Sequence, residues 1–146
     1  MTRRIIDPKR LRTTRSSAPD VEFQTSENGS PTAHIKFTSS ELSNGAPFQN
    51  VIITFTDVLS FHWTDSDAGI LPGNNHDLEL GLVEIEDSEL VQAMATRDRD
   101  LHPPQKITGG INWDTSVHHY RLAFDDYGTY DVICSKISVD FSLHSV

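Results

Sequence analysis

Residues 118–134, with the sequence HHYRLAFDDYGTYDVIC, constrain the fold of this chain more than any other segment. Bulky side chains alternate with smaller or polar ones on both sides of the stretch 125–128, and this period of two is typical of half-buried β-strands. The Asp-Asp-Tyr-Gly stretch itself favours a tight turn. The segment therefore predicts a β-hairpin. The side chains expected to share faces are Tyr120, Leu122 and Phe124 in the first strand and Tyr130, Val132 and Cys134 in the second.

Strand patterns recur along most of the chain, and only one segment favours a helix. Residues 21–38 are expected to form another hairpin, and residues 51–63 one long strand bent by a β-bulge near Asp57. A helix of about two turns is expected to begin at Asp87 or Ser88, because either side chain can cap its first turn. The pattern predicts a mainly β chain: an antiparallel β-sandwich or open meander sheet of about seven strands with one short α-helix.

Charge divides the 146 residues into two unequal parts. Six of the 12 Lys and Arg residues lie within residues 1–16, which contain one acid and so carry a net charge of +5. The other 130 residues therefore carry −14, since the whole chain carries −9. We expect residues 1–20 to be a basic leader with little order and residues 21–146 to form a single β-rich domain. An acidic domain repels nucleic acid and favours a basic protein partner.

Composition also bears on the cellular setting. The chain has one cysteine, Cys134, which lies in an apolar strand and is expected to be a buried, inert thiol. It has no apolar run of the roughly 20 residues that a membrane span needs, and no apolar segment typical of a secretory signal. The expected location is therefore cytoplasmic, without membrane association.

Complete catalytic and metal-binding motifs are not found in the sequence. The seven histidines show none of the spacings typical of zinc sites. Ser88 is expected to act as a helix cap, and the adjacent acids Asp125 and Asp126 as turn residues. The sequence predicts no enzyme, metal or cofactor. An enzyme built on His62, His119 and Asp125 is the alternative.

Aromatic residues beside acids are a better lead, because such combinations form binding sites for Arg- and Lys-rich proteins. Either tryptophan could instead belong to the core, or stack against a carbohydrate or other small ligand. A homodimer that pairs through an edge strand is a further alternative. The candidate binding residues are Trp63, Asp65, Asp67, Trp113, Asp125, Asp126 and Tyr127.

Three segments together resemble a known group of proteins. These are the strand 51–63, the stretch 83–88 (VEIEDS) that leads into the helix, and the hairpin with HYRLAFD and YDVIC. The chain resembles, over about residues 50–140, a loose group of small uncharacterised bacterial proteins, some of which resemble immunity proteins of polymorphic toxin systems. The shared residues are structural, and the group's usual aromatic residue after Ser88 is replaced by Glu89. The resemblance implies a bacterial, immunity-like binding protein that blocks its partner, and it assigns no functional residue.

Overall fold

The computed structural model describes residues 2–6, 11, 13, 16–25, 29, 31–39, 49–65, 81–101, 113 and 116–143. Within them the chain forms nine β-strands and one α-helix. In chain order these are β1 Thr2–Ile6, β2 Asp20–Gln24, β3 Thr32–Thr38, β4 Gln49–Thr56, β5 Ser60–Thr64, β6 Gly81–Glu86, α1 Glu89–Leu101, β7 His118–Phe124, β8 Gly128–Cys134 and β9 Lys136–Leu143.

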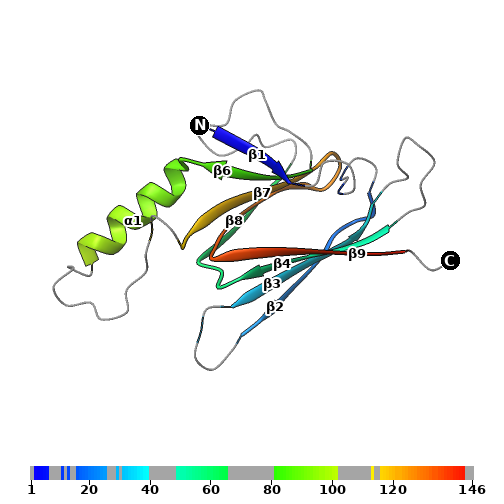
Figure 1. The fold of residues 1–146 in the computed structure, drawn as a ribbon, viewed down its shortest axis with the longest axis horizontal. Helices are drawn as coiled ribbons and strands as arrows, with labels where there is room; N and C mark the ends of the chain where they lie inside the picture. Colours follow the sequence, from blue (N-terminus) through cyan, green and yellow to red (C-terminus); the bar gives the residue numbers. More distant parts are fainter. Residues whose placement is uncertain are drawn as a thin grey trace.

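Two antiparallel sheets pack face to face as a β-sandwich (Figure 1). The five-stranded sheet has the order β1-β6-β7-β8-β5 and the four-stranded sheet the order β2-β3-β4-β9. The helix extends from the end of the five-stranded sheet, beyond β6 and β7, and does not cover the sandwich (Figure 1). The mainly β prediction with one helix is therefore confirmed, as is the pairing of the two predicted hairpins, β2–β3 and β7–β8.

The hydrophobic core lies between the sheets and follows the predicted alternation. Ile35, Ile53 and Phe55 of the four-stranded sheet are fully buried against Leu122 and Val132 of the other sheet. Burial of side chains of this size contributes roughly 1.5–3 kcal/mol each, which makes this layer the main source of stability. The other side of β7 and β8 is buried too, since all seven residues of β8 are buried. The five-stranded sheet therefore has no open face along β7 and β8.

The segment 51–63 was expected to form one bent strand, and that prediction is wrong. The chain leaves β4 at Thr56 and enters β5 at Ser60, and these strands belong to different sheets. Asp57 between them has a φ of 55°, a left-handed conformation that Asp tolerates better than most residues. The break therefore carries the chain from one sheet to the other, and Asp57 needs no place in the core.

Two further elements differ from what the sequence indicated. The helix has 13 residues, about twice the expected length. Thr2–Ile6, in the segment expected to have little order, pair with β6 as an edge strand, and Leu11 further along joins the core. A five-residue strand that lacks alternation is recognisable only through its partner.

Cys134 is expected to resist alkylation in the folded protein. Burial raises the pKa of its thiol to about 12, so the reactive thiolate is scarce at pH 8. Iodoacetamide at pH 8 should leave the native chain unlabelled and label it quickly in 6 M guanidinium, as read by intact mass. Rapid labelling of the native chain would contradict the burial of β8.

Candidate functional site: an exposed aromatic edge and a buried serine–histidine–aspartate array

Four aromatic side chains gather where edge strands of the two sheets meet. We call Phe23 of β2, Phe61 and Trp63 of β5, and Tyr127 of the β7–β8 turn the aromatic edge. The rings of Phe23 and Phe61 contact edge to face, with centroids 5.0 Å apart, and so join the two sheets. Phe23 is 53% exposed, Trp63 51% and Tyr127 36%, although large apolar groups are normally covered. This edge is therefore an unusual concentration of exposed aromatic surface.

The indole of Trp63 is held in place over the neighbouring turn. Its Nε1–H donates a hydrogen bond to the carbonyl oxygen of Tyr127 at 2.9 Å. Gly128, the next residue, has a φ of +86°, and a β-carbon there would lie 2.6 Å from Trp63 Nε1. The glycine thus serves both the turn and the close approach of the ring. A tryptophan that is exposed yet fixed loses little side-chain entropy on binding.

Acidic residues lie next to Trp63 and Tyr127 of the aromatic edge. Asp65 directly follows β5, whose last residue pairs with Thr129, and Asp125 and Asp126 belong to the adjacent turn. Asp65 and Asp126 are exposed. The structure therefore brings together five of the seven predicted binding residues: Trp63, Asp65, Asp125, Asp126 and Tyr127.

The two remaining predicted residues do not join this group. Asp67 lies outside the described residues. Trp113 is partly buried against the helix, where its Nε1–H donates to Asp98 Oδ2 at 2.9 Å. Phe23 was missed by the sequence analysis, although its alternation with Val21 places both on the inner side of β2. Only its contact with Phe61 shows that it belongs to the edge.

A second group of side chains, the buried array, lies on the side of the five-stranded sheet that faces away from the four-stranded sheet. Ser88 Oγ and His119 Nδ1 are joined by a 2.7 Å hydrogen bond, and His119 Nε2 lies 2.6 Å from Asp131 Oδ1. Arg121 Nε donates to the same carboxylate oxygen at 2.8 Å. All four side chains are at least 95% buried. Such a polar group inside a protein is costly unless its members satisfy one another.

Local structure explains how these side chains meet. Ser88 is the N-cap of α1, because the Val91 N–H donates to its Oγ at 3.2 Å. Asp87 before it has a φ of 54°, which turns the chain sharply from β6 into the helix. Arg121 and Asp131 face each other in the β7–β8 register, and His119 is two residues along on the same face.

The histidine-based alternative of the sequence analysis is therefore wrong in its grouping. His119 contacts Asp131 and Ser88, whereas Asp125 lies in the turn at the other end of β7. His62 is exposed on the edge strand β5, in register with Asp131. The observed turn covers residues 125–127, one residue fewer than the predicted 125–128, and this shorter turn sets the register that places Arg121 opposite Asp131.

One hollow of about 270 Å³ lies beside this array, between the start of α1 and the ends of β6 and β7. Ser88 and His119 both line it, together with Trp113 and Val91. The hollow also has acidic residues on its wall, of which Glu86 and Asp87 are exposed. The hollow therefore has three carboxylates, a hydroxyl and two imidazoles at its wall, and the His118 imidazole lies 3.6 Å from the Glu84 carboxylate.

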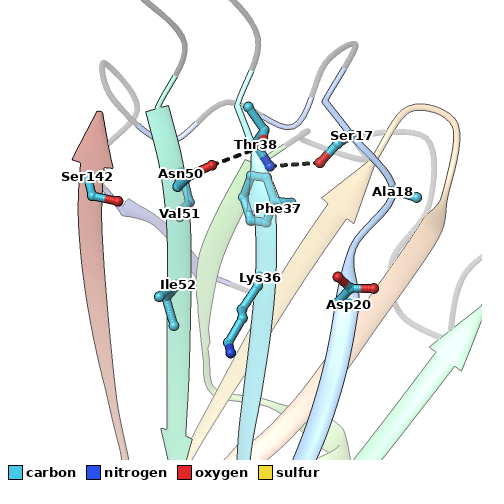
Figure 2. A pocket seen from close by; sticks show the side chains of 10 residues that line it. All are labelled: Ser17, Ala18, Asp20, Lys36, Phe37, Thr38, Asn50, Val51, Ile52 and Ser142. Atoms are coloured by element: carbon cyan, nitrogen blue, oxygen red, sulfur yellow. Dashed lines mark hydrogen bonds between the residues drawn. The ribbon is translucent and has the colours of Figure 1, made fainter. Parts of the chain in front are cut away.

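A second hollow, of about 330 Å³, lies over the four-stranded sheet and has a different character (Figure 2). The Thr38 hydroxyl donates to Asn50 Oδ1, and the Thr38 N–H to the Ser17 hydroxyl, so these polar groups satisfy one another (Figure 2). Lys36 and Asp20 add one charge of each sign. This hollow contains no grouping that indicates a particular ligand.

Neither a metal site nor a membrane span emerges from the described part of the chain. Within it, no three His, Cys, Asp or Glu side chains are arranged to hold a metal ion. No helix there is both long and apolar enough to cross a bilayer.

Known proteins offer no further guide to this site. No family model matches the chain, and no curated protein or solved structure matches it either. The resemblance to immunity-like proteins therefore remains a prediction. Any function has to be argued from the aromatic edge and the buried array themselves.

Proposed function

We propose that this chain is a protein-binding domain that uses the aromatic edge and its acids to bind a basic segment of another protein. The observation that carries the proposal is the exposure of Phe23 and Trp63 on two edge strands and of Tyr127 in the turn beside Trp63. Binding hot spots are enriched in Trp and Tyr, and they lie in patches that become dry in the complex. Three exposed aromatic side chains on one edge, of which Trp63 is held by a hydrogen bond, provide such a patch.

Charge favours a basic partner. Asp65 and Asp126 are exposed around the aromatic edge, and residues 17–146 carry a net charge of −14. A field of one sign steers a partner of opposite charge and raises the association rate. The resemblance to immunity proteins makes a basic toxin one candidate partner. In that case, binding would block the toxin by covering it, without catalysis.

The experiment is affinity capture of the full chain from cell lysate at low and high salt, followed by kinetics with the purified partner. Trp63→Ala is expected to weaken binding at least tenfold, the loss typical of a central aromatic contact. Asp65→Asn with Asp126→Asn is expected to slow association several-fold and to flatten its salt dependence.

The control is Asp20→Asn with Asp140→Asn, which removes two exposed acids from the four-stranded sheet. Because the net charge changes equally, a difference between the two pairs reports position and not total charge. Equal effects of the two pairs, or full affinity of Trp63→Ala, would refute the proposed edge. Capture of a second copy of this chain would replace the basic partner with a homodimer.

A further inference from the structure

We propose that the buried array is a hydrolytic site in which Ser88 is the nucleophile, His119 the general base and Asp131 the residue that positions His119. The three side chains stand in the order that activates a serine, hydroxyl to imidazole to carboxylate, at 2.7 Å and 2.6 Å. They come from the turn before α1, from β7 and from β8. This site is separate from the aromatic edge, because Phe61 and Trp63 belong to β5, which lies beyond β8, and Tyr127 lies in the turn after β7.

The hydrogen bonds show which ring nitrogen of a neutral His119 carries the proton. A carboxylate only accepts, so the Nε2–H donates to Asp131 Oδ1 and Nδ1 is left to accept the Ser88 O–H. The Val91 N–H donates to the same hydroxyl oxygen and would stabilise negative charge on it. Ser88 is therefore both hydrogen-bonded to a base and placed at the positive end of a helix.

Asp131 has one oxygen that receives no hydrogen bond from the residues that the structure describes. Its Oδ1 accepts from both His119 and Arg121, while its Oδ2 is buried and accepts none from them. A buried, unsatisfied oxygen is rare and marks either strain or a functional role. Here Arg121 holds the carboxylate in place, and Oδ1, which accepts from His119 Nε2, stabilises the imidazolium that forms when His119 takes the serine proton.

The adjoining hollow indicates the substrate. Its volume of about 270 Å³ lies just below the range of ordinary ligand pockets, which favours a small molecule. Among the described residues that line it there is no Lys or Arg, whereas Glu86 and Asp87 are exposed there beside Trp113. Carboxylates and an indole together favour an organic cation. The substrate class is a small ester or thioester that carries a positive charge.

Hydrolysis of an ester or thioester at Ser88 needs only water and no cofactor. Ser88 Oγ bonds to the carbonyl carbon while its proton passes to His119 Nδ1, and the alcohol or thiol then leaves with that proton. Water next attacks the acyl-serine, which releases the acid and restores Ser88. The backbone N–H groups of Glu89 and Leu90, which have no acceptor within the helix, are available to the carbonyl oxygen as its charge develops.

The first test is labelling of the purified full chain with a fluorophosphonate, read by intact mass and peptide mapping. A single adduct on Ser88 is expected. Ser88→Ala should abolish it and His119→Gln should slow it at least about 100-fold. Ser116→Ala, which alters an exposed serine, should leave it unchanged. No adduct on the folded wild-type chain would overturn the proposal, and this outcome does not depend on how any variant folds.

The second test is hydrolysis of acetylthiocholine against a neutral thioacetate of equal length. The cationic ester should give the higher kcat/KM, and Asp87→Asn should reduce that preference while preserving the turn, because Asn also adopts positive φ. Asp131→Asn should lower kcat at least about 100-fold with little change in KM. Hydrolysis equal to that of Ser88→Ala would refute the site and leave the binding proposal untouched.

Discussion

Asp131→Ala is expected to lower the free energy of unfolding by about 3–5 kcal/mol. The change leaves the buried guanidinium of Arg121 without its carboxylate and His119 Nε2 without its acceptor. Both groups are at least 95% buried, so water cannot replace the lost partner without opening the sheet. Urea unfolding followed by circular dichroism measures the difference.

Asp126→Ala is the matched control, because Asp126 is exposed in the neighbouring turn. It is expected to change stability by less than about 1 kcal/mol. The double variant Arg121→Met with Asp131→Leu should recover much of the loss, since an apolar pair of similar size needs no hydrogen-bond partners. If Asp131→Ala were as stable as the control, the burial of this array would be refuted.

Gly128→Ala is expected to destabilise the fold by about 2–4 kcal/mol and to displace the Trp63 indole. A φ of +86° costs a residue with a β-carbon about 1–2 kcal/mol. The new β-carbon would also lie 2.5 Å from the Thr64 carbonyl oxygen and 2.6 Å from Trp63 Nε1, and such overpacking costs about 1–3 kcal/mol. Urea unfolding gives the first quantity, and the tryptophan emission spectrum reports the displaced ring.

Gly81→Ala separates the two contributions. Gly81 has a φ of +104°, but a β-carbon there would meet only Leu11 O at an ordinary 3.8 Å. The two variants therefore share the backbone cost, and only Gly128→Ala has the clash. Equal destabilisation by both would mean that Trp63 does not lie against the turn.

Most, but not all, residues of the aromatic edge could be predicted from the local sequence pattern. Trp63, Asp65, Asp125, Asp126 and Tyr127 were proposed from the sequence because aromatic residues stood beside acids, and the structure places them together. Phe23 lies 40 positions from Trp63, and no local signal connects it to the edge. Trp113 matched the same pattern but packs against α1 instead.

The sequence by itself determined most of the strands, the two hairpins and a helix that begins at Asp87 or Ser88. These features depend on the alternation of side chains and on turn or cap residues that lie within a few positions of one another. Such short-range patterns can be recognised in the sequence alone. Only the tertiary structure decided that the chain passes from one sheet to the other at Asp57. The alternation of side chains continues from β4 into β5 whichever sheet each strand joins.

Tertiary structure also decided which residues became the two sites. Ser88 lies 31 positions from His119, and His119 lies 12 positions from Asp131. In the sequence these residues are a helix cap, a strand histidine and a strand aspartate, each with an ordinary local explanation. They form one array because the fold buries them together where β7, β8 and the start of α1 meet. Burial of that kind depends on segments distant in the chain, so no local pattern records it.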